Sequence, residues 1–285
     1  MKIKKIIGIA AIVVLCGIAV FSGVVVHHQY QDQKNSAQQF EDLSNMIADV
    51  DKSELDKEPV PEPGEDAPVS ETISEEELAE REAELAMEKY RALFDQNSDF
   101  VGWISIERTN IDYPVMQTID NPNYYLKHSF EKQYSDYGVP YVQENCDLGL
   151  SDNCVIYGHH MNNGSMFADL CKYTDEDFYR EHKTIRFDTL SGFGEYEVIV
   201  AFKTVAYSEQ GFKYYHFVNA GSAGDFNTYI AKCKELALYD TGVSAEYGDK
   251  LITLSTCEYS RQNGRMVVVA KQVIPPAVEV DGDET

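Results

Sequence analysis

The hydrophobic and polar positions divide the chain into an apolar N-terminal run, a polar acidic stretch and a long segment with strand-like patterning. Residues 6–26 form an uninterrupted apolar run that follows lysines at positions 2, 4 and 5. A helix of this length, at about 1.5 Å per residue, crosses a bilayer. The run exceeds the apolar core of a signal peptide, and no clear cleavage site follows. We therefore expect an uncleaved transmembrane anchor over 6–26, with residues 1–5 as a cytoplasmic tail and the remainder of the chain outside the cell.

Residues 27–73 are polar and acidic, and their second half contains Pro59, Pro61, Pro63 and Pro68. Such a composition buries too little apolar surface to fold, while prolines and like charges keep it extended. We expect an acidic, proline-rich stalk that holds a folded domain away from the membrane, with a short helix around 40–50 left open. An acidic C-terminal tail is expected over 275–285.

The segment 74–274 has the patterning of one folded domain. A capping-box sequence at 74–77 opens a helix that reaches about residue 95. Later helical patterns cover 165–173 and 224–239. Runs rich in β-branched and aromatic residues predict strands at 100–106, 111–116, 139–142, 154–157, 184–187, 196–207, 251–254 and 265–273.

These elements predict an all-β dominated fold. About eight strands with few helices indicate a closed or nearly closed β-barrel. One helix precedes the barrel, and another lies in the connection before the last two strands. The 44% hydrophobic content is sufficient for a sizeable core.

Charge and cysteine content exclude some functions. The formal net charge of −24 argues against nucleic acid and anionic lipid as partners, although much of it falls in one segment. The six cysteines show no zinc-type spacing, and no metal or other cofactor is expected. Five of them are interpreted as small apolar residues: Cys16, Cys146, Cys154, Cys171 and Cys233. A disulfide between Cys146 and Cys154 stays open for an extracellular domain.

The last two predicted strands and their connecting loop carry the first candidate chemistry. Cys257 follows the strand at 251–254, and Arg265 opens the next strand after an Asn263-Gly264 turn signal. A guanidinium near a thiol favours thiolate, the nucleophilic form of cysteine. A buried, inert Cys beside a solvated Arg is the alternative interpretation.

An imidazole candidate lies near the end of an earlier strand, in the sequence Ile-Tyr-Gly-His-His-Met at 156–161. Gly158 would permit a tight bend that projects His159 from the strand end. A cysteine-based acyl transfer needs a thiol, an imidazole and a donor for the oxyanion. A metal site at His159 and His160 is disfavoured because neighbouring residues of an extended chain point to opposite faces.

These residues closely resemble the motifs of the sortases. The sequence Thr-Leu-Ser-Thr-Cys at 253–257, the downstream Arg265 and the upstream Gly-His occur in the sortase order. The Asn-Ser-Asp-Phe-Val-Gly-Trp-Ile-Ser-Ile sequence at 97–106 and the long helix before the Cys strand are similar to class B. The resemblance covers about residues 85–274 and implies the sortase type of barrel.

The resemblance implies a role for individual residues. Cys257 would be the nucleophile, His159 the acid and base, and Arg265 the residue that stabilises the oxyanion and positions substrate. Arg261, in the loop, is a competitor for that last role. Candidate substrate-binding residues are Ser255, Glu258, Leu126, Ser208 and Phe212. A groove asparagine of some members is not clearly placed, because Asn121 and Asn123 flank the position.

The implied function is a Gram-positive surface enzyme. A class B sortase, a cysteine transpeptidase with a peptidase-like first step, would cut a sorting signal of the Asn-Pro-X-Thr type after Thr. It would attach the surface protein to a cell-wall peptide amine or peptidoglycan precursor. The alternatives are a pilin-polymerising sortase with the same chemistry, and a catalytically silent peptide-binding module.

Overall fold

The computed structural model describes residues 2–55, 75–207, 209 and 211–273. Eight strands close into one barrel in the order β1-β2-β3-β4-β7-β8-β6-β5. This confirms the predicted eight-stranded barrel. The strands are β1 (Phe100–Ser105), β2 (Asp112–Met116), β3 (Tyr141–Val142), β4 (Asn153–Tyr157), β5 (Thr184–Thr189), β6 (Glu195–Val205), β7 (Leu251–Cys257) and β8 (Gly264–Gln272).

Two strand pairs in the barrel are parallel, β2 with β3 and β4 with β7, and the others are antiparallel. Strand β7 lies between its parallel neighbour β4 and its antiparallel neighbour β8. Residues 251–256 are all buried, so both faces of β7 are covered. A strand buried on both faces loses the alternation of polar and apolar positions, which explains the continuous apolar character of this one.

Two of the helices agree with predicted ones in type and place, and the others differ. Helix α2 (Glu75–Gln96) precedes the barrel, and helix α4 (Ala223–Glu235) lies between β6 and β7, with Ser222 capping its first turn. The predicted helix at 165–173 is the 3-10 helix η2 (Phe167–Thr174). Helix α3 (Glu176–Glu181) was not predicted. Two further 3-10 turns, η1 (Tyr124–Leu126) and η3 (Tyr214–His216), lie in connections.

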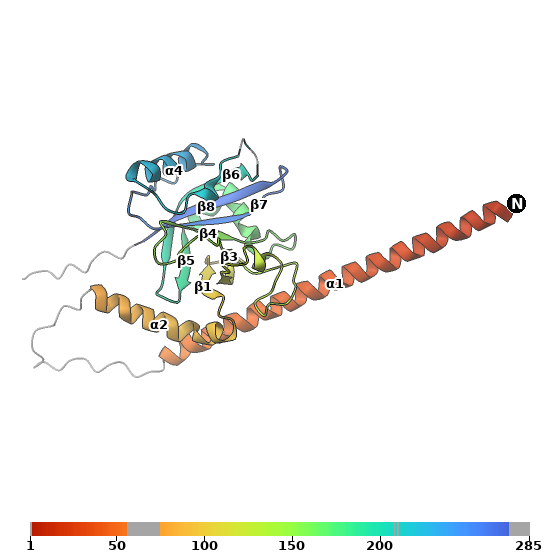
Figure 1. Ribbon diagram of the computed structural model, residues 1–285, viewed down its shortest axis with the longest axis horizontal. Coiled ribbons are helices and arrows are strands. Elements are labelled where there is room, and N and C mark those ends of the chain that lie inside the picture. Colours follow the sequence, from red (N-terminus) through yellow and green to blue (C-terminus); the bar gives the residue numbers. More distant parts are fainter. Residues whose placement is uncertain (1, 56–74, 208, 210, 274–285) are drawn as a thin grey trace, which may run out of the picture.

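Helix α1 (Lys2–Leu55) is the largest departure from expectation. Its first half extends away from the barrel, and its second half lies along the barrel beside α2 (Figure 1). The prediction of an extended chain is therefore wrong for residues 27–55, and the helix left open around 40–50 is part of α1. The reason is a stripe of buried side chains, Phe40, Leu43 and Ile47, repeating every three or four residues on one helix face. The remainder of the predicted stalk and the predicted C-terminal tail lie outside the described residues.

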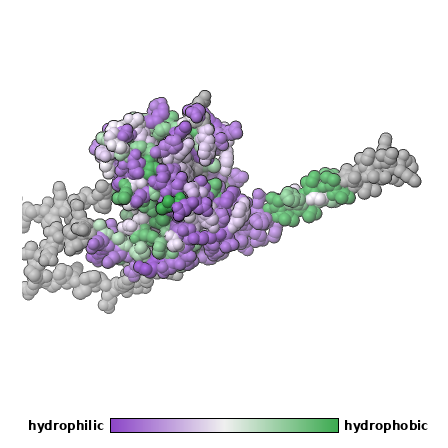
Figure 2. Space-filling model, in the orientation of Figure 1, coloured by the Kyte–Doolittle hydropathy of each residue, from purple (hydrophilic) through white to green (hydrophobic). Residues whose placement is uncertain are grey.

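The exposed part of α1 is hydrophobic on its surface, and the part along the barrel is mostly hydrophilic on the face visible in Figure 2. Among the described residues, the helix over Ile12–Ala48 is the one that is long and apolar enough to cross a membrane. Its most apolar window is 0% buried within the protein. A signal sequence near the N-terminus would share these properties.

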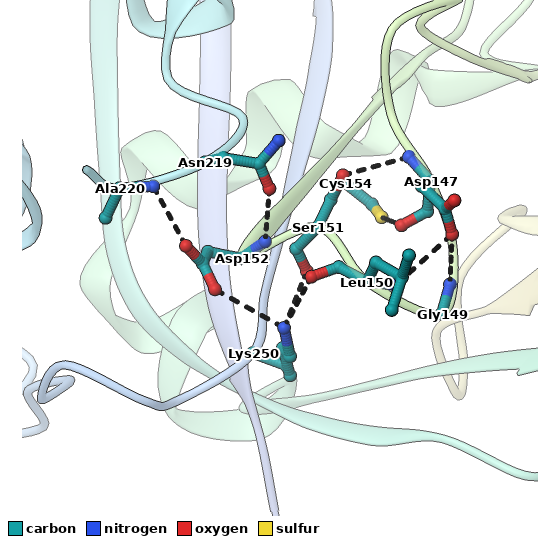
Figure 3. A network of polar contacts seen from close by, with 9 residues as sticks. All are labelled: Asp147, Gly149, Leu150, Ser151, Asp152, Cys154, Asn219, Ala220 and Lys250. Carbon is teal, nitrogen blue, oxygen red and sulfur yellow. Dashed lines mark hydrogen bonds and ion pairs between the residues drawn. The ribbon is translucent and has the colours of Figure 1, made fainter. Parts of the chain in front are cut away.

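A polar network fixes the loop between β3 and β4. Lys250 donates to the carbonyl oxygens of Leu150 and Ser151 and to the Asp152 carboxylate, at 2.8, 3.2 and 3.3 Å (Figure 3). Asp152 also accepts from the Ala220 backbone N–H at 2.9 Å. The network therefore connects this loop to the segments that precede β7 and α4.

Cys146 lies in the same loop, and Cys154 lies just after it in β4. Their thiols are free, as are those of the other cysteines in the described residues. The sulfur of Cys146 is 3.4 Å from the Val155 nitrogen, and that of Cys154 is 3.9 Å from the Asp147 carbonyl oxygen. Both side chains are buried, which agrees with their interpretation as small core residues.

Candidate active site

The candidate nucleophile and the candidate oxyanion residue are direct partners across one pair of strands. Cys257 ends β7 and is paired with Arg265, the second residue of the antiparallel strand β8. Directly opposed residues of an antiparallel pair lie on the same face, with Cβ atoms about 4.5–5.5 Å apart. The backbone ladder therefore places the Cys257 and Arg265 side chains on one face, and the guanidinium donates to the Gly264 carbonyl oxygen at 2.9 Å.

The loop between the two strands is short and fixed by its backbone. Asn263 adopts a left-handed conformation with φ 55°, which suits the turn signal identified in the sequence. A Cβ at Gly264 would lie 2.3 Å from the Glu258 carbonyl oxygen, so only glycine fits there. Arg261 lies exposed in this turn, whereas Arg265 lies within the ladder.

His159 approaches from the other neighbour of β7. Tyr157, the last residue of β4, is paired with Ser255 in the parallel register, and the Gly158 N–H donates to the Ser255 carbonyl at 3.1 Å. Continuing this register by two residues brings His159 level with Cys257. Three sequence-predicted residues therefore gather at adjacent strand ends: Cys257, Arg265 and His159.

Glycine is required at position 158 for a reason other than the expected tight bend. Its φ is not in the left-handed region. Instead, a Cβ at this position would lie 2.5 Å from the ring of Phe167. Gly158 is therefore required for close packing, and the Phe167 N–H then donates to the His159 carbonyl at 2.8 Å.

One hydrogen bond fixes the proton on the His159 ring. Nε2 lies 2.8 Å from the carbonyl oxygen of Leu126. A carbonyl oxygen only accepts, so Nε2 carries hydrogen and Nδ1 is the nitrogen that can exchange a proton. Burial lowers the pKa of His159; the Leu126 hydrogen bond and Asp136 oppose this shift, and Lys127 reinforces it.

His160 has a place in the site that the sequence did not reveal. Its Nδ1 lies 3.0 Å from the carbonyl oxygen of Cys257 and 3.3 Å from the sulfur of Cys171. The Tyr259 hydroxyl donates to the His160 carbonyl at 2.8 Å. Burial raises the pKa of the Cys171 thiol to about 11, so this second cysteine stays protonated near neutral pH. These contacts hold the backbone around Cys257. In the sequence, the only indication of this role of His160 was its position next to His159.

Two predicted substrate-binding residues flank Cys257 in sequence but differ in surroundings. Ser255 is buried, and its hydroxyl is 2.6 Å from that of Tyr214. Glu258 pairs with Lys203 at 3.2 Å. Burial would raise the Glu258 pKa, but hydrogen bonds from Ser260 and Lys203 outweigh it and lower that pKa. Because Thr204 pairs with Arg265, Lys203 and the Glu258 carboxylate lie on the opposite sheet face.

The other predicted substrate-binding residues come from segments outside the β7–β8 strand pair. Leu126 is 38% exposed, and its carbonyl serves His159. Phe212 is half-buried, with its ring 5.9 Å from that of Phe202. Ser208 lies outside the described residues. Asn123, one of the two unplaced asparagines, accepts a hydrogen bond from the Tyr141 hydroxyl at 2.8 Å.

Two surface hollows are present, one far from Cys257 and one beside the His160–Cys171 contact. One of about 570 Å³ is lined by the β1–β2 turn and by the starts of β5 and β6. Strand β6 begins there and ends beside Arg265, so its length separates this hollow from the candidate site. The second, of about 500 Å³, is lined by His160, Cys171 and residues of η2 and α3. Within the described residues, no group of three or more acidic, His or Cys side chains could hold a metal ion.

Known proteins share this sequence and this arrangement. Residues 104–273 match the sortase domain. The chain is 32% identical to Sortase B of Listeria monocytogenes over 276 residues, which are 96% of this chain and 99% of that protein. Both the sequence match and the chemistry of the site therefore agree with the resemblance seen in the motifs.

Solved structures extend the similarity to the fold. The Staphylococcus aureus sortase B–substrate complex has a TM-score of 0.68 and 25% identity, covering 85% of this chain and 98% of that one. A sortase B complexed with triglycine has a TM-score of 0.60 and 30% identity, covering 70% and 94%. Over most of its length, then, this chain belongs to the sortase family of transpeptidases, in its class B.

Proposed function

We propose that this chain is a membrane-anchored extracellular cysteine transpeptidase that cleaves an Asn-Pro-X-Thr type sorting signal after Thr. It would join the new carboxyl end to a cell-wall peptide amine. The supporting observation is the direct pairing of Cys257 with Arg265, with His159 two residues past the end of the neighbouring strand β4. Similarity to a sortase B–substrate complex and to a triglycine complex supports peptide and amine substrates.

In the first half-reaction, the Cys257 thiolate attacks the carbonyl carbon of the signal threonine. Negative charge develops on the carbonyl oxygen, where the Arg265 guanidinium stabilises it. His159 in its protonated form gives a proton from Nδ1 to the leaving amine. The carbon–nitrogen bond then breaks and leaves a thioester between substrate and enzyme.

In the second half-reaction, an acceptor amine attacks the thioester carbonyl. His159, now neutral, takes a proton from that amine while the carbon–sulfur bond breaks. A new amide forms and the thiolate of Cys257 is restored, so atoms and charges balance over the cycle. No metal or other cofactor is needed for either step.

The proposed location follows from helix α1. Its exposed apolar part would span the membrane with residues 1–5 inside the cell, and the barrel would face the cell wall. Both proposed substrates are found on that side. N-terminal sequencing of the membrane fraction tests this arrangement, because a mature chain that starts near His27 in the medium would contradict it.

The function is tested with the purified full-length chain and a fluorogenic peptide carrying Asn-Pro-X-Thr. We expect cleavage after Thr, together with a mass increase of the protein equal to the peptide acyl group. The Cys257→Ala variant is the matched control and should show neither. A wild-type chain that binds the peptide without gaining this mass would be a silent binding module, and the proposal would be wrong.

The acceptor is identified by the same assay with added amines. A short peptide amine that releases the thioester agrees with cell-wall attachment. Release only by a lysine side chain of a folded protein would instead favour the pilin-polymerising alternative.

A further inference from the structure

Helix α1 contacts one surface loop of the barrel through a charged residue. Asp32 accepts hydrogen bonds from the Ser135 hydroxyl at 2.9 Å and from the Asp136 backbone N–H at 2.8 Å. Ser36, one turn further along the helix, is buried and lies 3.3 Å from the same Ser135 hydroxyl. The helix therefore holds residues 135–136 at two adjacent points.

The loop over residues 126–138 transmits this attachment because it is folded as a hairpin. His128 and Tyr134 form an antiparallel bridge across it. The Ser135 N–H donates to the Lys127 carbonyl at 3.0 Å, and the Lys127 ammonium pairs with Asp136 at 2.8 Å. The two residues bound by Asp32 are thus directly bonded to Lys127.

The residue before Lys127 is the partner of the candidate acid and base. Leu126 accepts the hydrogen bond from Nε2 of His159 at 2.8 Å through its carbonyl oxygen. The loop touches the histidine segment at a second point, where Asn163 donates to the Tyr137 hydroxyl at 3.1 Å. The orientation of the His159 ring therefore depends on where the 126–138 loop is held.

We propose that Asp32 is a positioning residue for His159. Acting through the 126–138 loop, the helix that carries the apolar N-terminal run fixes the Leu126 carbonyl and, with it, the ring that transfers the proton. This inference rests on the proposed function because it takes His159 as the acid and base. Displacing a catalytic group by about 1 Å can lower the rate by as much as 10²-fold, so such a support has a measurable effect.

A purely structural role for Asp32 predicts a different result for its variants. If Asp32 only fastened α1 to the barrel, its loss would lower stability and leave the chemistry of the folded protein unchanged. The apolar contacts of Phe40, Leu43 and Ile47 hold the helix independently of Asp32. A change in kcat and in the His159 ring without unfolding therefore distinguishes positioning from fastening.

The experiment compares Asp32→Ala, Asp32→Asn and Asp42→Ala in the full-length chain in detergent micelles. Asp42 is the matched control, since it is exposed on the same helix and accepts from Gln38 of that helix. We expect Asp32→Ala to lower kcat by about 10-fold with little change in KM. Asp32→Asn should keep most of the wild-type kcat, because its amide can donate to the Ser135 oxygen and still accept from the Asp136 N–H. Asp42→Ala should match the wild type.

A second readout does not depend on activity. Nitrogen-15 NMR of the His159 ring should show a changed Nε2 signal in Asp32→Ala and a wild-type signal in Asp42→Ala. An unchanged His159 signal in folded Asp32→Ala would overturn the inference, whatever happens to kcat. Full activity of His159→Ala would refute the proposed function. Even then, the His159 ring signal in Asp32→Ala would still test the link between α1 and the loop.

Discussion

The candidate site is assembled from two regions that are held in different ways. Cys257 and Arg265 lie on one strand pair, and their opposition follows from the ladder between β7 and β8. His159 lies just past a strand end, and its ring is held by the carbonyl of Leu126, 33 residues earlier in the chain. The first placement is local and backbone-encoded, whereas the second depends on tertiary contacts among loops and a distant helix.

This difference has consequences for how each region responds to change. A strand ladder tolerates substitutions at its surface because its hydrogen bonds are made by backbone groups. A ring fixed by one loop carbonyl moves whenever that loop moves. Substitutions far from the thiol should therefore impair the histidine more readily than the Cys257–Arg265 pair.

Loss of the nucleophile is expected to have the largest effect. Cys257→Ala should reduce peptide cleavage below detection, since removing the nucleophile of a covalent hydrolase costs about 10⁶-fold in kcat. The barrel should survive, because Cys257 ends its strand and alanine fits the ladder. Steady-state cleavage and circular dichroism measure the two expectations. Cys154→Ala and Cys233→Ala serve as controls and should keep turnover near that of the wild type.

The next effect concerns which arginine acts beside the thiol. Arg265→Ala and Arg265→Lys should each lower kcat by about 10²–10³-fold, because a point charge does not reproduce the guanidinium fork. Arg261→Ala should change kcat little, since Arg261 is exposed in the turn. Steady-state cleavage by the three purified variants decides the assignment. A severe defect in Arg261→Ala beside a nearly active Arg265→Ala would reverse it.

The strand pair is also the region that sequence patterns predict best. The apolar runs, the Asn263-Gly264 turn signal and the motif residues are all contiguous, so they are visible without the fold. The eight strands were predictable for the same reason. The patterns alone did not predict the parallel pairing of β4 with β7, because it joins segments about a hundred residues apart and no local signal marks it.

The contacts of the histidine could not be predicted from sequence for a physical reason. Its partner is the backbone oxygen of Leu126, and every residue type offers the same carbonyl. Around 40–50 a helix had been left open, but its continuation through the second half of α1 was missed because, among the residues up to 48, Phe40, Leu43 and Ile47 are the buried apolar ones in a mostly polar stretch. Such a thin stripe looks solvent-exposed until the surface that covers it is known.

A glycine substitution in the 126–138 loop tests the sensitivity of the histidine region. Gly138 has φ +59°, and an added Cβ would lie 2.3 Å from the Tyr125 carbonyl oxygen and 2.8 Å from that of Leu126. Gly138→Ala must therefore displace the carbonyl that holds His159. We expect kcat to fall by about 10-fold or more and the free energy of unfolding to fall by about 1–3 kcal/mol.

Two other glycines separate the causes of that effect. Gly242 has φ +74° with nothing within 4 Å of an added Cβ, so Gly242→Ala reports backbone strain alone. At Gly149 the nearest atom would be 3.7 Å away, and Gly149→Ala should be nearly neutral. Peptide-cleavage kinetics and thermal melts on all three variants are the measurement. If Gly138→Ala and Gly242→Ala lost the same activity, the loop would have no special relation to His159.

Helix α1 contacts the loop that holds His159. Loss of its buried apolar side chains should lower the stability of the protein more than its turnover. Leu43 is 4% exposed, and Leu43→Ala should lower the free energy of unfolding by about 2–5 kcal/mol. Leu85, on α2, is 37% exposed and provides the control, since Leu85→Ala should cost far less. Denaturant unfolding of the full-length variants measures both. Equal losses would mean that α1 contributes little to the packing of the barrel.

The smallest expected effect is electrostatic and has opposite signs at two neighbouring residues. Burial lowers the pKa of His159, Lys127 lowers it further, and Asp136 raises it. The side chains of Lys127 and Asp136 are 46% and 40% exposed, so solvent screens both influences. Lys127→Gln should therefore raise the His159 pKa slightly, and Asp136→Asn should lower it.

The sign of the change in activity follows from the role of the ring. His159 must be protonated to give a proton to the leaving amine, and it loses that proton as the pH rises through its pKa. A raised pKa extends the active range upward, so the alkaline limb should move to higher pH in Lys127→Gln and to lower pH in Asp136→Asn. NMR titration of the ring and pH profiles of kcat/KM measure the same shift independently. Shifts in the same direction for both variants would mean that their effect comes from movement of the loop, because the charges alone require opposite signs.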